Sequence, residues 1–286
     1  MLWHRAYTND MGAYLRPQRL EEALLALARP HSVLAGGTDF YPSRVGRTIE
    51  EDVLDIGGIA VLRGISATVD GWRLGATTTW SEVIAADLPP LFNGLKQAAR
   101  EVGGRQIQNA GTLAGNLCNA SPAADGVPCL LTLDAEVEIA SRMTTRRMPL
   151  GQFISGVRRT VLAPGELVIA FHVPNPRHSA RSAFLKLGAR RYLVISIAMV
   201  AATLEIAEDR IATARIAVGA CSAVAQRLPA LEAALLGAPV DGYLADRIDR
   251  AHLAPLAPID DVRGSADYRR DAALVLLRRL LAGFAA

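Results

Sequence analysis

The most chemically suggestive part of this sequence is a stretch of small and polar residues at positions 103–125. It holds four glycines, which tolerate backbone angles and close approaches that other residues resist. No helical or strand period runs through it, so we expect a long loop between apolar helices at 91–102 and 126–133. Main-chain amides, the Thr112 hydroxyl and the Asn116 amide would suit the oxygens of a phosphate-bearing ligand.

A second, shorter segment could bind the same kind of group. Residues 31–35 form an apolar run, and Gly36-Gly37-Thr38-Asp39 follows directly. A strand that ends in Gly-Gly-Thr can point consecutive amides at an anion, although glycine pairs after strands often mark simple turns. From this segment alone, the turn and the phosphate site both stay open.

The other residue types that could do chemistry form no recognisable set. The three cysteines, Cys118, Cys129 and Cys221, lack metal-type spacing, and their unpaired number fits a reducing compartment. We expect Cys118 and Cys129 to be buried small side chains rather than redox thiols. The histidines show no ligand spacing, and there is no Ser-His-Asp or paired-carboxylate set. We therefore predict no metal site in the chain and name no catalytic acid or base.

Length and composition narrow the class of protein. The 286 residues suffice for two domains with a large core, and half of them are apolar. The net charge is only +3 and the basic residues are scattered, which argues against nucleic acid binding. The first residues do not start a secretory signal, and no apolar run is long enough for a membrane span. We expect a cytoplasmic enzyme or enzyme subunit.

The elements that must position the two glycine-rich segments alternate between helix and strand. We expect helices at 18–28, 82–86, 91–102 and 126–133, and strands at 31–35, 52–56, 63–69, 72–76, 135–140, 144–148 and 167–173. Thr79 and Ser81 are candidate helix caps, and Asp125 could cap the helix that follows it, a role that competes with ligand contact.

Two prolines within 174–179 mark the best domain boundary. Beyond it, we expect three strands followed by three helices, at 182–187, 194–204, 210–220, 228–236, 242–252 and 266–282. Runs of strands followed by runs of helices favour the α+β class.

With both glycine-rich segments in hand, the chain resembles the FAD-binding medium subunits of molybdenum hydroxylases, a family that includes xanthine, carbon monoxide and N-heterocycle dehydrogenases. Three blocks carry the resemblance, in the family's order: VLAGGTD at 33–39, QIQNAGTLAGN continuing to SPAAD at 106–125, and DDVRGSADYRR at 260–270. The resemblance implies a two-part FAD-binding domain of the vanillyl-alcohol-oxidase (PCMH) type at 1–177, with parts at about 1–57 and 58–177. A domain like the C-terminal domain of carbon monoxide dehydrogenase flavoproteins, a three-stranded sheet with helices, would follow at 178–286.

The resemblance also implies which residues hold FAD. The first glycine-rich segment would wrap the pyrophosphate, and Thr112 and Asn116 would hold the diphosphate and its ribityl side. Asp125 would hydrogen-bond the cofactor, and Lys186 would reach the flavin. The full implied set is Val33, Leu34, Ala35, Gly36, Gly37, Thr38, Asp39, Phe40, Val102, Ile107, Gly111, Thr112, Gly115, Asn116, Cys118, Asp125, Val168 and Lys186.

The implied activity is that of one subunit in an oxidoreductase complex. A small partner subunit with two 2Fe-2S clusters would deliver electrons from a large subunit that carries the molybdenum cofactor. FAD on this chain would pass them to an external acceptor, and the family suggests a dimer of heterotrimers. Two alternatives stay open: a non-catalytic scaffold that kept the fold but lost FAD, and a free-standing flavin oxidase.

The chain departs from the family pattern in three places. Ala114 and Gln108 stand where the family usually has glycine and arginine. After Arg190-Arg191, the residues Tyr192-Leu193-Val194 replace acidic residues of the xanthine dehydrogenase branch, which disfavours NAD as the acceptor and leaves oxygen, a quinone or another carrier. Tyr192 either stacks near the flavin ring or simply packs. Three dispersed cysteines cannot supply four cluster ligands, so we predict no extra iron–sulfur cluster.

Overall fold

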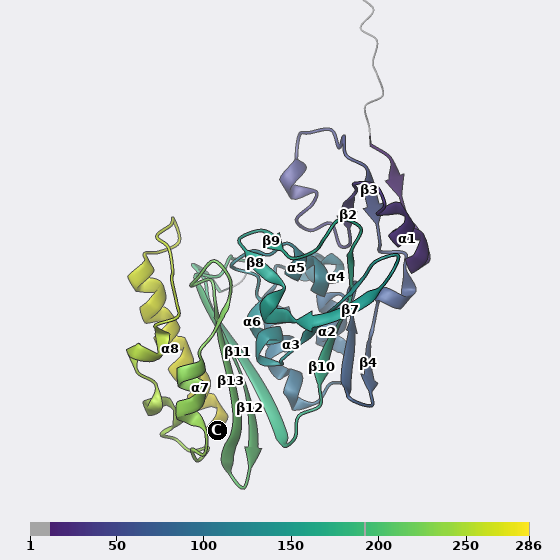
Figure 1. Cartoon of the computed structure of the whole chain (residues 1–286). Coiled ribbons are helices and arrows are strands. Elements are labelled where there is room, and N and C mark those ends of the chain that lie inside the picture. Colours follow the sequence, from purple (N-terminus) through teal and green to yellow (C-terminus); the bar gives the residue numbers. More distant parts are fainter. Residues whose placement is uncertain (1–11, 192, 286) are drawn as a thin grey trace, which may run out of the picture.

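The computed structural model describes residues 12–191 and 193–285, and it arranges them in alternating layers of helices and sheets (Figure 1). From left to right in that view, two outer helices cover one antiparallel sheet, a middle layer of helices follows, and a second sheet lies beyond it. A small parallel sheet at the top holds the start of the described chain. The expected α+β class is confirmed.

The small sheet contains only short strands. Its order is β1-β3-β2, and both pairings are parallel. Helix α1 covers it by packing Ala23 and Leu24 against Leu54, and it ends before Pro30 as the sequence predicted. The elements are β1 (Tyr14–Leu15), α1 (Leu20–Ala26), β2 (Ser32–Leu34), η1 (Pro42–Arg44), β3 (Val53–Asp55) and η2 (Ala60–Leu62).

The second sheet is a five-stranded antiparallel sheet of order β4-β5-β10-β6-β7. Its strands are β4 (Ile65–Thr68), β5 (Gly71–Gly75), β6 (Glu136–Ala140), β7 (Thr145–Pro149) and β10 (Leu167–Pro174). The strands expected at 63–69 and 72–76 pair as one antiparallel hairpin, and those expected at 135–140 and 144–148 pair as another. A short hairpin lies between β7 and β10, made of η4 (Leu150–Gln152), β8 (Ile154–Gly156) and β9 (Arg159–Thr160).

The middle helical layer packs its apolar residues on this sheet. Leu95 and Leu130 belong to the same buried cluster as Val137 and Phe171 of the strands. Thr79 begins the first of these helices with a capping box to Glu82, so the predicted cap is confirmed. The elements are α2 (Trp80–Ala85), η3 (Pro90–Phe92), α3 (Asn93–Glu101) and α6 (Gly126–Thr132).

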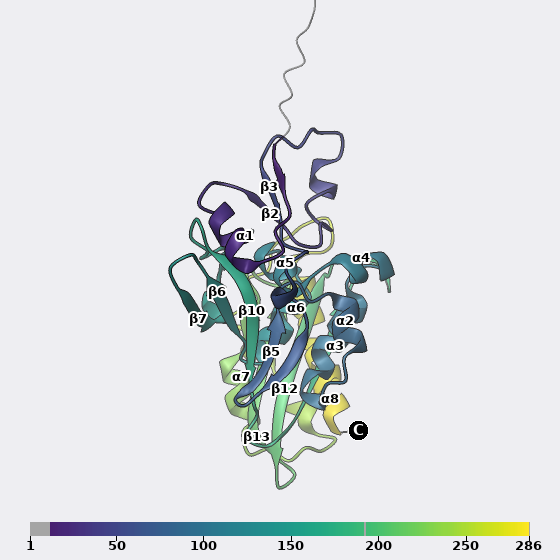
Figure 2. The same cartoon turned by 90° about the vertical axis from the view of Figure 1, so that its right-hand side faces the viewer.

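The stretch 103–125 is not the structureless loop that we expected. It contains two short helices, α4 (Arg105–Ala110) and α5 (Leu113–Cys118). Helix α5 begins at Thr112, whose hydroxyl accepts a hydrogen bond from the Gly115 amide at 3.1 Å. Six residues are too few to show a period, which is why the pattern gave no helix. Figure 2 shows α4 at the molecular edge and α5 beneath the small sheet.

Beyond Pro176 the chain forms a long antiparallel sheet of order β11-β12-β13-β14. Its strands are β11 (Ser179–Leu187), β12 (Ala198–Ala207), β13 (Arg210–Gly219) and β14 (Gln226–Arg227). The three predicted strands are present, but two-residue β14 extends the expected three-stranded sheet by one. The second strand begins at Ala198 rather than at 194, because the chain before it leaves the sheet. Glu208 and Asp209 form the turn between β12 and β13, and both residues have positive φ angles.

The outer helical layer differs from expectation at 242–252. In place of one helix, the chain forms two short turns, because Asp249 accepts hydrogen bonds from the amides of Ala251 and His252 and starts a new turn. The elements are α7 (Pro229–Leu235), η5 (Leu244–Arg247), η6 (Arg250–Leu253) and α8 (Ala266–Ala285). Among the described residues, no helix is long and apolar enough to cross a membrane.

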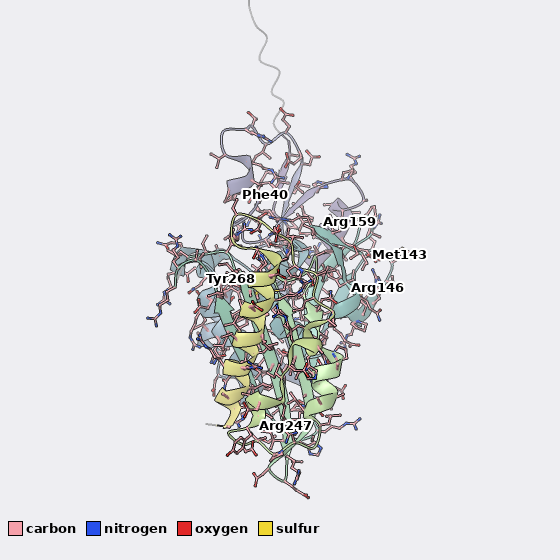
Figure 3. The ribbon with its side chains drawn as sticks, turned by 90° about the vertical axis from the view of Figure 1, so that its left-hand side faces the viewer. Phe40, Met143, Arg146, Arg159, Arg247 and Tyr268 are labelled. Atoms are coloured by element: carbon pink, nitrogen blue, oxygen red, sulfur yellow. The ribbon has the colours of Figure 1, made fainter. Side chains whose placement is uncertain are left out.

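The long C-terminal sheet is buried on both faces. Phe184 and Met199 on its inner face join the cluster that includes Leu95 of α3. Val200 on its outer face packs in a second cluster with Leu277 of α8, which runs along the front of the molecule in Figure 3. The inner face therefore fixes the position of the C-terminal sheet relative to the middle helices.

Candidate functional site

A cavity of about 460 Å³ lies where the loop after β2 faces α4 and α5. Every residue of the set implied by the resemblance lines it, except Asp125 and Lys186. The sequence analysis missed further lining residues, namely Arg44, Ile56, Trp80, Ala114, Asn119, Leu162, Glu166 and Leu167. The two glycine-rich segments, more than sixty residues apart in the sequence, thus form opposite walls of one site.

The two walls touch through their main chains. A Cβ atom on Gly36 would lie 1.8 Å from the carbonyl oxygen of Ala110, so only glycine fits there. Gly37 has a φ of +70°, in the left-handed region that favours glycine. A Cβ on Gly111 would come within 3.5 Å of the Thr38 hydroxyl. Glycine is therefore required for the close approach at Gly36 and favoured by the backbone angle at Gly37.

The first wall offers unused hydrogen-bond donors. Within the described part of the chain, the main-chain amides of residues 36–39 donate no hydrogen bond. On the second wall, the Thr112 hydroxyl accepts from the Gly115 amide, and the side-chain Oδ1 of Asn116 accepts from the Gly126 amide at 3.2 Å. Both side chains therefore keep their O–H or N–H donors for a ligand. A lining that combines these donors with apolar side chains such as Trp80 and Val168 fits a dinucleotide with a pyrophosphate.

Two cations at the cavity are committed to carboxylates. The Arg44 Nε donates to Glu51 at 2.6 Å, and its guanidinium lies 3.8 Å from the centre of the Phe40 ring. Glu166 accepts from Arg146 through both oxygens, at 2.9 and 2.8 Å. These hydrogen bonds from Arg146 hold the pKa of Glu166 below its ordinary value. Neither pair is expected to break easily, because each is held by more than one contact.

A third cation lies at the rim. Arg158, in the turn between β8 and β9, places its Nη1 atom 3.2 Å from Oδ2 of Asp39 and donates to the side-chain oxygen of Asn119. Its φ of +56° is unusual for a residue with a side chain and costs about 1–2 kcal/mol. Both partners of Arg158 line the cavity.

The thiol of Cys118 at the cavity wall has a raised pKa. Cys118 is half-buried, and burial raises the pKa of its thiol to about 12. Cys129 is fully buried, and burial raises its pKa well above the usual range. The raised pKa values favour the neutral thiols near pH 7, and the expected burial is present at Cys129 and only partial at Cys118.

Asp125 and Lys186 lie behind the cavity and bind each other. The Lys186 Nζ donates to Asp125 Oδ2 at 2.6 Å, and Ser196 donates to Asp125 Oδ1 at 2.6 Å. Each side chain of the ion pair is only 6% exposed. Burial raises the pKa of the Asp125 carboxyl, and the Lys186 charge opposes that shift. The capping role considered for Asp125 is wrong, because its carboxylate makes no cap hydrogen bond.

Two other sequence-based predictions concern the segment around residue 192 and the binding of metal ions. Tyr192 lies outside the described residues. Arg190 next to it is exposed and donates through Nε to the carbonyl oxygen of Leu193 at 3.1 Å. No group of three or more histidine, cysteine or acidic residues in 12–191 and 193–285 is placed to hold a metal ion.

Comparisons with known proteins identify the family of the chain. The family model for the FAD binding domain in molybdopterin dehydrogenase matches residues 7–176, and that for the CO dehydrogenase flavoprotein C-terminal domain matches residues 183–283. The chain is 31% identical over 266 residues to the putative xanthine dehydrogenase FAD-binding subunit of Escherichia coli strain K12, with 91% of each chain covered.

Two further similar proteins carry names other than xanthine dehydrogenase. The chain is 30% identical to the nicotine 6-hydroxylase medium subunit of Paenarthrobacter nicotinovorans, covering 94% of this chain and 95% of that subunit. Its structure matches a chain of reconstituted CO dehydrogenase from Oligotropha carboxidovorans with a TM-score of 0.86 and 27% identity, covering 94% of this chain and 96% of the other.

Proposed function

Because the chain belongs to the FAD-binding medium subunits of the molybdenum hydroxylases, we propose that it holds one FAD in the cavity between its two glycine-rich walls and relays electrons from partner iron–sulfur clusters to an external acceptor. The observation that carries this proposal is that the main-chain amides of residues 36–39 donate no hydrogen bond within the described part of the chain. These residues line the same cavity as Thr112 and Asn116, whose side chains keep free donors. Such a pair of walls suits a pyrophosphate better than an apolar ligand.

The residues of this chain bind and orient the cofactor rather than react. When bound, FAD supplies the two-electron redox chemistry. Loop 36–39 and the start of α5 would hold its phosphates, and Trp80, Ile107 and Val168 would exclude water. We keep Asp125 and Lys186 in the proposed binding set, since a buried cation near an electron-rich ring would stabilise it.

The partners follow from the family. As a medium subunit, the chain is one component of a multi-subunit oxidoreductase complex. We propose a small subunit with two 2Fe-2S clusters and a large subunit with the molybdenum cofactor as its partners, in a dimer of heterotrimers. The cytoplasm is the proposed location, because three free cysteines suit a reducing compartment.

The proposed domain division is 1–177 and 178–286, with the first domain divided near 57/58. Pro174 at the end of β10 and Pro176 just beyond it support the main boundary, since the chain there changes from the five-stranded sheet to the C-terminal sheet. The change from the small parallel sheet to the antiparallel one supports the division near 57/58.

The test is a flavin titration of the purified full chain. We expect one equivalent of FAD to bind and to show a protein-bound oxidised-flavin spectrum. The iron–sulfur subunit, reduced and then freed of excess reductant, should bleach this spectrum when mixed with the loaded chain. NAD, oxygen and a quinone would then be compared as reoxidants. A folded chain that binds no FAD, alone or with its partner subunits, would contradict the proposal and favour the scaffold alternative.

A further inference from the structure

One guanidinium joins the two walls of the cavity at its rim. Arg158 contacts Asp39 of the first glycine-rich segment, and it donates to the side-chain oxygen of Asn119, which follows α5. Its Nη1 is also 3.5 Å from the Asn119 carbonyl oxygen. Because Asp39 and Asn119 both line the cavity, the charge of Arg158 lies beside the space that a ligand would occupy.

The main chain fixes Arg158 at the turn of the β8–β9 hairpin. Its φ of +56° lies in the region where glycine or asparagine is the usual choice, and its amide donates to the Ala120 carbonyl oxygen at 2.9 Å. The next residue, Arg159, labelled in Figure 3, lacks any side-chain hydrogen bond or ion pair within the described residues.

The ion pair between Arg158 and Asp39 is the one at this cavity in which a ligand could replace the carboxylate. The two side chains are 53% and 56% exposed, so their attraction is screened by water and weak. Arg146 instead donates two hydrogen bonds to Glu166, and Arg44 donates to Glu51 and to the Phe40 carbonyl oxygen. A phosphate group offers Arg158 more charge and a two-pronged geometry, so it would replace the carboxylate of Asp39.

We propose that Arg158 binds the diphosphate of the nucleotide cofactor. Arg158 would give up its ion pair with Asp39 when the cofactor binds, and its contact with the diphosphate would hold the β8–β9 hairpin against both walls. The inference rests on the proposed function and deepens it, because it assigns recognition of the diphosphate to a side chain outside the two glycine-rich walls. Arg158 is then a binding residue, and Asp39 is its partner in the cofactor-free state.

The variant R158G tests this role without a penalty at the backbone, because glycine prefers the φ angle found there. FAD affinity is measured by fluorescence titration of the flavin-free full chain, and ADP affinity by calorimetry. We expect R158G to weaken both ligands about tenfold, a loss of about 1.4 kcal/mol. The matched control R159Q also removes one exposed arginine charge from the hairpin and should change neither Kd by more than about twofold.

Two further measurements separate an anchor from a structural tie. The Tm of the cofactor-free chain should stay equal or rise in R158G. The variant D39N keeps the main-chain amide of residue 39 and removes only the carboxylate that competes for Arg158, so it should tighten FAD binding. If Arg158 only ties the walls together, D39N and R158G would weaken FAD equally, or R158G would lower the Tm of the cofactor-free chain; either result overturns the proposal.

The same titrations distinguish the two levels of inference. A wild-type chain that binds neither FAD nor ADP contradicts the proposed function itself. A wild-type chain that binds FAD, with R158G binding it equally well, leaves the proposed function intact and overturns only the role of Arg158. An equal loss in R158G and R159Q would show a general effect of net charge and would also overturn the anchor.

Discussion

Substituting Gly36 with alanine should separate the two walls of the cavity. The added Cβ would lie 1.8 Å from the Ala110 carbonyl oxygen, and real Cβ contacts essentially never fall below 3.0 Å, so the walls must move apart by at least 1.2 Å (3.0 minus 1.8). No second side-chain change can relieve this contact, because the obstacle is a main-chain atom.

A shift of that size is enough to remove hydrogen bonds from the ligand. Hydrogen bonds from N–H to oxygen span only about 2.7–3.2 Å, so amides displaced by more than an ångström lose their acceptors. Each lost hydrogen bond to a charged group is worth about 1.5–3 kcal/mol, which corresponds to roughly ten- to hundredfold in Kd. Overpacking of the contact should also lower the stability of the cofactor-free chain by about 1–3 kcal/mol.

Fluorescence titration with FAD and thermal unfolding of the cofactor-free chain measure the two effects. Gly46 offers the control, because it lies nearby in the sequence with a φ of +75° and nothing within 4 Å of an added Cβ. The variant G46A should lose about 1 kcal/mol of stability through backbone strain and keep its FAD affinity. The reasoning is refuted if G36A binds FAD as tightly as wild type, or if G46A loses as much affinity as G36A.

Three other variants or treatments address the remaining groups at and behind the cavity. Replacing Glu166 by glutamine should lower the free energy of unfolding by about 1 kcal/mol at pH 7, since the partial exposure of Arg146 limits the strength of the ion pair. Because the folded pKa of Glu166 is lowered from 4.5, this difference should persist above that value and vanish as the pH falls through the lower folded pKa, which urea unfolding between pH 3 and 8 would follow. Cys118, with a pKa of about 12, should react with iodoacetamide at pH 8 at roughly one thousandth of the rate of a free cysteine or slower, as followed by mass spectrometry. The variant D125N leaves a charged Lys186 buried and should cost about 3–5 kcal/mol in urea unfolding, whereas the double variant D125N/K186M should recover part of that loss.

Each of these expectations has a clear contrary result. A Glu166 effect that grows as the pH falls would contradict the lowered pKa. Rapid alkylation of Cys118 in the folded chain would show that its thiol ionises easily despite burial. A double variant less stable than D125N would mean that Lys186 has other partners that matter more than Asp125.

The sequence predicted the cavity walls because glycine leaves a physical signature there. Gly36 permits a close main-chain approach that a Cβ would prevent, and Gly37 has a positive φ, which favours glycine. The strands were also predictable, since their apolar runs are bounded by turns such as Asp70-Gly71. Both signals are residue types that a single sequence displays, although the partner of Gly36 in that approach, Ala110, is distant in the sequence.

Features set by distant contacts were missed. Asp125 precedes a helix, as a cap would, but its carboxylate is taken by Lys186, 61 residues away. Arg158 sits 119 residues from Asp39, and nothing in its local sequence indicates a cavity rim. The short helices α4 and α5 were missed for another reason, because six residues are too few to reveal a helical period.

The inner face of the C-terminal sheet has a consequence for how the molecule can be divided. Phe184, Met199 and Ala217 belong to the same buried cluster as Leu95 and Leu130. A fragment cut after Pro176 would expose that cluster to water on both sides of the cut. The two segments matched by separate family models should therefore unfold in a single cooperative transition. Replacing the second segment with that of a relative would require the residues of its inner face to be redesigned so that they pack on the helices of the first segment.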